Sequence, residues 1–75
     1  MDMPNIEMIA VSSSNVESIG YDADTQTLQI RFLNGGVYIY RNVPPMEFDQ
    51  LLNAPSIGSY LNRNIKGIYA YERIG

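Results

Sequence analysis

Apolar and polar residues alternate most regularly in residues 27–33, which read TLQIRFL. Leu28, Ile30 and Phe32 occupy every second position there, a period typical of a strand with one buried face. Residues 16–22 (VESIGYD) and 68–74 (IYAYERI) alternate in the same way. The pattern therefore predicts at least three strands.

A further strand is expected at residues 37–43, after the hairpin turn that Asn-Gly-Gly at 34–36 indicates. A two-residue turn pairs Phe32 with Val37, whereas a three-residue turn pairs Phe32 with Tyr38 and turns the tyrosines of this strand toward the core. We favour the three-residue turn, because its glycine bulge suits the double glycine. In either register an apolar pair remains on the second face of the strand.

Two short helices are expected after Pro44 and Pro45, since proline favours the first helical position. The first covers residues 45–53, and Asn-Ala-Pro at 53–55 ends it. The second begins at Ser56 as N-cap and runs to Lys66 and Gly67. Its apolar stripe has spacings of three and four, as expected for one buried face, and comprises Ile57, Tyr60, Leu61 and Ile65.

The element order β-β-β-α-α-β predicts a small α+β domain. Its antiparallel sheet would combine a three-stranded hairpin meander with a C-terminal strand, and both helices would cover one face. Residues 11–75 form this domain, while residues 1–10, interrupted by Pro4, form an N-terminal arm or edge strand.

A chain of 75 residues has a marginal core, and this one has neither cysteine nor histidine. Disulfides and the usual zinc site are therefore excluded, and neither a metal nor a cofactor is expected. Oligomerisation is the remaining way to bury more apolar surface. The two-faced strand thus predicts a homo-oligomer whose interface contains Leu33, Val37, Tyr38 and Ile39.

The net charge is −3, from eight acidic and five basic residues. This balance argues against a protein that grips a long duplex by counterion release. No apolar stretch has the length of a membrane span, and the N-terminus lacks a signal-peptide pattern. We therefore expect no membrane partner and a cytoplasmic location, in the host cytoplasm if the protein is phage-encoded.

The start of the second helix is the best candidate for a ligand contact. Ser56 and Ser59 lie where free N–H groups favour an anion, Gly58 allows close approach, and Arg63 and Lys66 continue the stripe of Ser59. The alternative is that Ser56 only caps the helix, Gly58 only allows packing and the two cations are solvated.

Six tyrosines accompany two phenylalanines. A tyrosine ring can stack on a base, and Tyr40 and Tyr71 are the candidates, although tyrosine is also common in strands. Arg41 is a candidate phosphate ligand or a cross-strand partner of Glu72. Without cysteine or histidine as nucleophile or base, the chain is not expected to be an enzyme.

Several motifs in sequence order resemble the KTSC domain, a family named for the C-terminus of some lysyl-tRNA synthetases. The similar segments are VSSSNVESIGYD, TLQIRF, NGGVYIYRNVP, APSIGSYLNRNI and a closing tyrosine, over about residues 10–71. The marks of the family are Tyr38, Tyr40, Val43, Pro44, Ser56, Gly58, Ser59 and Asn62. The resemblance implies no established activity, and its synthetase connection suggests RNA binding.

These observations predict a non-enzymatic, homo-oligomeric binding protein for a small nucleotide-type anion, such as a cyclic oligonucleotide. Ser59, Arg63 and Lys66 would hold phosphate, and Tyr40 or Tyr71 would stack on a base. The full set of predicted ligand-binding residues is Ser56, Gly58, Ser59, Asn62, Arg63, Lys66, Tyr40, Tyr71 and Arg41. Such a protein could act as a sponge that sequesters host signalling nucleotides, as some phage-encoded proteins do. The alternatives are an accessory module for RNA or tRNA and a protein–protein interaction domain.

Overall fold

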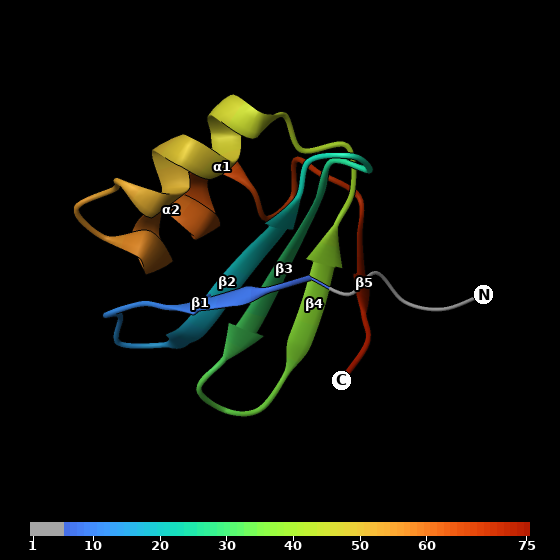
Figure 1. Ribbon diagram of the computed structural model, residues 1–75. Coiled ribbons are helices and arrows are strands. Elements are labelled where there is room, and N and C mark those ends of the chain that lie inside the picture. The colour runs from blue at the N-terminus through green and yellow to red at the C-terminus, as the bar shows by residue number, and fades with distance from the viewer. Residues whose placement is uncertain (1–5) are drawn as a thin grey trace.

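A computed structural model, which describes residues 6–75, contains one antiparallel sheet with two helices against it (Figure 1). The sheet has five strands in the order β1-β2-β3-β4-β5. The strands are β1 Met8–Ala10, β2 Val16–Asp22, β3 Thr27–Phe32, β4 Val37–Tyr40 and β5 Tyr71–Arg73. The helices, α1 Pro45–Leu52 and α2 Ile57–Asn64, lie between β4 and β5 in the chain.

The α+β class and the antiparallel sheet are confirmed, but the sheet has one strand more than predicted. The additional strand is β1, which lies in the segment expected to be an arm or an edge strand and pairs with β2 through Met8–Gly20 and Ala10–Ser18. The first five residues of the predicted arm lie outside the described part of the chain. Neither helix within residues 6–75 is long and apolar enough to cross a membrane.

The hairpin between β3 and β4 turns the tyrosines toward the helices, as we favoured, but in a register two residues away from the predicted one. Ile30 pairs with Tyr38 instead of Tyr40. The turn closes when the Gly35 N–H donates to the Phe32 carbonyl at 2.9 Å, and Gly35 adopts a φ of 95°. Because Gly35 takes the left-handed conformation, Gly36 joins the ladder and shifts the pairing.

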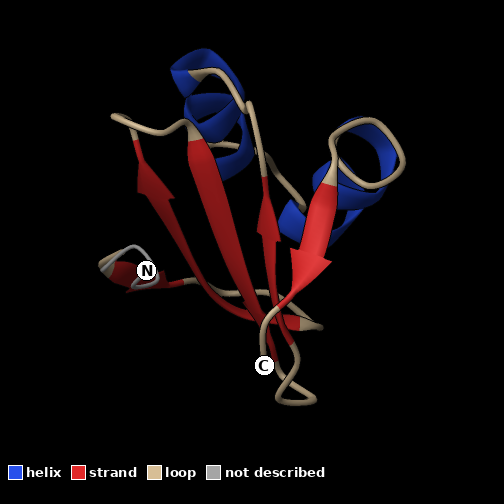
Figure 2. Ribbon diagram, turned by 90° about the vertical axis from the view of Figure 1, so that its right-hand side faces the viewer, coloured by secondary structure: helices blue, strands red, loops and turns tan. Residues whose placement is uncertain are grey.

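The core lies between the sheet and the two helices, which pack on the same face (Figure 2). Ile19 and Ile30, paired across β2 and β3, form its centre. Ser56 caps α2, and its hydroxyl accepts a bond from the Ser59 N–H at 3.3 Å. The buried core residues are Val16, Ile19, Leu28, Ile30, Phe32, Tyr40, Val43, Leu51, Ile57, Leu61 and Ile65.

The second face of β4 is already covered within one chain. Val37 and Ile39 are 6% and 2% exposed, whereas Leu33 is 56% exposed. Val37 exchanges backbone hydrogen bonds with Gly75, whose Cα region lies against the Val37 side chain. The expectation that Val37 and Ile39 are uncovered without a second copy is therefore wrong. Homo-oligomerisation stays a prediction, but the apolar pair Val37 and Ile39 no longer supports it.

The N-terminal arm lies against β2, on the face of the sheet that Ile39 shares through the pairs Gly20–Gln29 and Gln29–Ile39. A Cβ placed on Gly20 would lie 2.6 Å from the Glu7 carbonyl oxygen and 2.6 Å from a methyl group of Ile6. The backbone of the arm thus touches β2 where a side chain would otherwise stand. Glycine at position 20 is what allows this approach.

Candidate functional site

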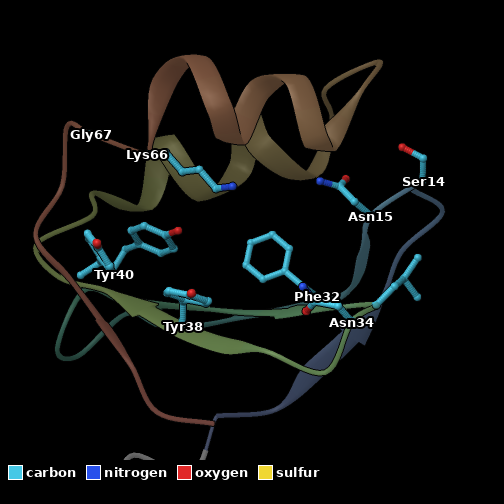
Figure 3. A pocket seen from close by; sticks show the side chains of 10 residues that line it. Ser14, Asn15, Phe32, Asn34, Tyr38, Tyr40, Lys66 and Gly67 are labelled. Atoms are coloured by element: carbon cyan, nitrogen blue, oxygen red, sulfur yellow. The ribbon is translucent and has the colours of Figure 1, made fainter.

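A cleft of about 750 Å³ opens between the sheet and the segment that joins α2 to β5 (Figure 3). Its volume falls in the range of small-molecule sites, about 300–1,000 Å³. The loop before β2, the end of β3, the β3–β4 hairpin, β4, β5 and the segment after α2 all contribute to it. The lining residues are Ser14, Asn15, Phe32, Leu33, Asn34, Tyr38, Tyr40, Lys66, Gly67 and Tyr71.

Aromatic rings form the floor of the cleft. Phe32 and Tyr38 meet edge to face with centroids 5.6 Å apart, and Tyr71 lies 5.9 Å from Tyr38 and 6.0 Å from Tyr40. Tyr71 is 62% exposed, whereas Tyr40 is 2% exposed. Tyr71 therefore offers an accessible ring, whereas the ring of Tyr40 beside it is buried.

The phenol of Tyr40 keeps its proton. Burial raises its pKa, and the neighbouring Tyr38 and Tyr71 raise it further. A protonated phenol can donate a hydrogen bond to a ligand. The two tyrosines that the sequence proposed for stacking, Tyr40 and Tyr71, thus lie together in one cleft.

Of the described residues that line the cleft, Lys66 alone carries a charge, and none is acidic. Its ammonium group lies 5.0 Å from the centroid of the Phe32 ring. A second cation stands beside the floor, since Arg73 Cζ lies 5.9 Å from the Tyr38 centroid. The cleft is thus locally positive in a chain whose net charge is −3.

Two asparagines at one end of the cleft were not predicted. The Asn15 Oδ1 atom accepts a bond from the Ser13 hydroxyl at 3.2 Å, and the Asn34 Oδ1 atom accepts one from the Gly36 N–H at 2.9 Å. Both stand in sequences, SSSN and NGG, whose composition indicates turns. The sequence therefore indicated only a turn role for these two asparagines. Hydrophobic patterning contains no information on whether a polar turn residue also lines a cleft.

The predicted anion site at the start of α2 is a separate and smaller hollow of about 250 Å³. Ser56, Ser59 and Arg63 line it, but Lys66 does not. The prediction that Lys66 continues their stripe is wrong, because α2 ends at Asn64. Beyond that point the chain turns, and the left-handed Gly67, with φ of 80°, redirects it.

The other predicted ligand residues have structural contacts or lie outside the cleft. A Cβ on Gly58 would lie 2.7 Å from Asn15 Oδ1, so Gly58 allows α2 to pack on the loop before β2. Asn62 is exposed on α2 and lines neither hollow. Arg41 Nη2 donates to Glu72 Oε1 at 2.7 Å, the cross-strand alternative.

A polar cluster behind the cleft connects both helices to the segment that precedes β5. The carboxylate of Glu47 on α1 accepts hydrogen bonds from the hydroxyls of Tyr60 on α2 and of Tyr69, the latter at 3.1 Å. The bond to Glu47, with burial, raises the pKa of Tyr60 to about 12. Burial and the same carboxylate raise the pKa of Tyr69.

The comparison with known proteins identifies related chains. The family model of the KTSC domain matches residues 12–69. A KTSC domain protein from Yersinia pestis, known from a crystal structure, is 37% identical with a TM-score of 0.90, covering 93% of this chain and 99% of that one. A protein of Tsukamurella paurometabola is 46% identical over 59 residues, which are 79% of this chain and 88% of its own. A lysine–tRNA ligase of Nostoc punctiforme is 37% identical over 73 residues, 97% of this chain but 13% of the ligase.

Proposed function

The chain belongs to the KTSC domain family, and from this premise we propose that it is a non-enzymatic binding protein for a small nucleotide-type anion. The ligand would occupy the cleft between β4 and the segment that follows α2. One observation carries the proposal: aromatic rings, of which that of Tyr71 is exposed, and a lysine line the same cleft, without an acidic side chain among the described lining residues.

The aromatic floor fits the planar part of such a ligand. Stacking of a base on an aromatic side chain contributes about 1–3 kcal/mol and tolerates different bases. Tyr71 has the exposed ring, and Tyr38 lies beside it at 5.9 Å. A base that stacks on Tyr71 would place its sugar and phosphate toward the loop end of the cleft, where Lys66 reaches in.

The charge of the chain favours a small ligand over a long polymer. Each phosphate that a protein neutralises on a nucleic acid requires a nearby cation. Lys66 and Arg73 can serve one or two phosphates, while eight acidic residues elsewhere repel a long polyanion. Sequestration of a signalling nucleotide, as by a sponge, would require binding alone and no chemical step.

A thermal-shift titration tests the proposal. The probes are cyclic di-AMP, cyclic di-GMP, cyclic triadenylate, ADP-ribose and AMP, with adenosine as the uncharged reference. A ligand at 100 times its dissociation constant stabilises the fold by about 2.7 kcal/mol, which raises the melting temperature of so small a domain by several degrees. The absence of a shift with every nucleotide would rule the proposal out.

A second candidate function, an accessory module for tRNA, is favoured by the ligase relatives. Three lysine–tRNA ligases match 97% of this chain, and each match is 13% of the ligase. The same cleft could hold an unpaired nucleotide of a tRNA. Binding of tRNA that weakens steeply with salt, together with no response to the small nucleotides, would favour this function over the first.

A further inference from the structure

The loop end of the cleft presents hydrogen-bond donors, and we infer that Asn15, Asn34 and Lys66 form a subsite for a single phosphodiester group. This inference deepens the proposed function and rests on it.

Each of the two asparagines makes one side-chain hydrogen bond through its amide oxygen. In each, the Oδ1 atom already accepts a bond, from the Ser13 hydroxyl or from the Gly36 N–H. Among the described residues, neither Nδ2 group donates to a protein acceptor. An Asn34 amide rotated by 180° would lose its bond, because the Gly36 N–H can only donate, so the Asn34 NH₂ group is the end left for a ligand. The Ser13 hydroxyl can also accept, so the Asn15 amide is described as the structure places it, with its nitrogen on the side of Lys66.

Asn15, Asn34 and Lys66 line the same cleft. Figure 3 shows the Asn15 amide nitrogen and the Lys66 ammonium group pointing toward each other above the Phe32 ring, with Asn34 below that ring. Lys66 has three donors and no acceptor. The subsite therefore suits a group with acceptor atoms only, such as phosphate, and disfavours an amine or an amide N–H.

The number of charges selects among phosphates. Of the described lining residues, Lys66 alone is cationic, and the two amides are neutral. The Nε of Arg73 on the rim donates to the Gly75 carbonyl at 2.9 Å. One ammonium group balances one phosphodiester, which has a single negative charge, whereas a triphosphate would leave several charges unpaired in an acidic protein.

The test uses asparagine-to-aspartate variants, because aspartate retains the oxygen that accepts the internal bond and removes the donor. Asn15→Asp and Asn34→Asp are compared with Asn62→Asp, which makes the same charge change outside both hollows. The probe is the dinucleoside monophosphate ApA, which has one phosphodiester, and its affinity is measured by calorimetry alongside adenosine and ATP.

We expect ApA to bind more tightly than ATP or adenosine. Each cleft variant should weaken ApA binding by at least about tenfold, since it loses one hydrogen bond to a charged group and gains a repulsive carboxylate. Asn62→Asp should stay within about twofold of the parent chain, as expected for a distant surface charge. All three variants should melt within a few degrees of the parent chain, because Asn15→Asp and Asn34→Asp retain the internal bonds and Asn62 is exposed.

The alternative outcomes are distinct. Undiminished ApA binding in both cleft variants would overturn the subsite, and tighter binding of ATP than of ApA would overturn the assignment to a phosphodiester. Either result leaves the proposed function intact if cyclic dinucleotides still bind. Failure of every nucleotide to bind the parent chain would overturn both. Should Asn15→Asp unfold the loop before β2, Asn34→Asp decides, because Asn34 belongs to a separate turn.

Discussion

The Lys66 ammonium group lies over the face of Phe32, 5.0 Å from the ring centroid, and this contact places a cation inside an aromatic cleft. Such a cation–π contact is worth about 0.5–1 kcal/mol at an exposed site. That energy is enough to bias the lysine toward the cleft but small compared with a charge-assisted bond to phosphate. A bound anion can therefore draw the ammonium group away from the ring.

Replacement of Lys66 by methionine should weaken nucleotide binding by about 10- to 100-fold, the value of one hydrogen bond to a charged group. Arg63→Met is the matched control, because it removes the same charge from the smaller hollow at the start of α2. Calorimetry with cyclic di-AMP distinguishes the two. Loss of affinity in Arg63→Met instead would place the ligand in the smaller hollow.

Replacement of Tyr71 by alanine should lower affinity by about 1–3 kcal/mol, the contribution of one stacked base. Stability should change little, because the ring is 62% exposed. Ile68→Ala, which removes an equally exposed apolar side chain outside the lining of the cleft, is the control. Equal affinities of the two variants would contradict a stacking role for Tyr71.

Stability should fall as the pH rises above 10. The Tyr60 hydroxyl donates to Glu47 in the folded chain, which raises its pKa from the ordinary 10.0 to about 12. A raised pKa contributes stability that is fully present below the unfolded pKa, near 10, and is lost as the pH approaches 12. Tyr60→Phe should therefore show a shallower decline of urea-unfolding free energy over this window. Identical slopes would mean that the bond to Glu47 contributes nothing.

Replacement of Ile39 by alanine should destabilise the fold by about 2–5 kcal/mol, as truncation of a buried isoleucine does. Ile39 is 2% exposed in one chain, so this loss should be the same at low and high protein concentration. Unfolding curves at two concentrations provide the measurement. A loss that grows as the protein is diluted would show that a second copy covers Ile39.

The substitution Gly20→Ala should displace residues 6–7, which lie against β2. The alanine Cβ would lie 2.6 Å from the backbone oxygen of Glu7, a contact that cannot relax by side-chain rotation. We expect a loss of about 1–3 kcal/mol, as for other overpacked sites. Faster hydrogen exchange in residues 6–10 is the readout. Gln29→Ala, at the position paired with Gly20 on β3, is the control and should leave that exchange unchanged.

Hydrophobic patterning predicted the strands where one face meets the helices. Residues 16–22 form β2 as expected, and Leu28, Ile30 and Phe32 all point into the core. The burial of Val37 and Ile39 could not be predicted in this way, because the segments near that face come from the two ends of the chain. Gly20, which admits the arm, has no side chain and thus no hydropathy signal.

The candidate site was predicted in part. Tyr40, Tyr71 and Lys66 lie in the cleft, yet the sequence grouped Lys66 with Ser59 and Arg63. That grouping assumed a helix through residue 66, and element ends depend on local turns that periodicity locates poorly. Asn15 and Asn34 were interpreted as turn residues, which they also are.

The hydrogen bonds from Tyr60 and Tyr69 to Glu47 connect α1 to the segment that lines the cleft. Lys66 and Gly67 belong to an irregular stretch that Ile65, fully buried, anchors at one end and the Tyr69 hydroxyl anchors at the other. The far anchor is supplied by α1, none of whose residues lines the cleft. Substitutions in the first turn of α1 can therefore move Lys66 and Gly67 and reshape the cleft from a distance, while every residue that lines the cleft stays the same.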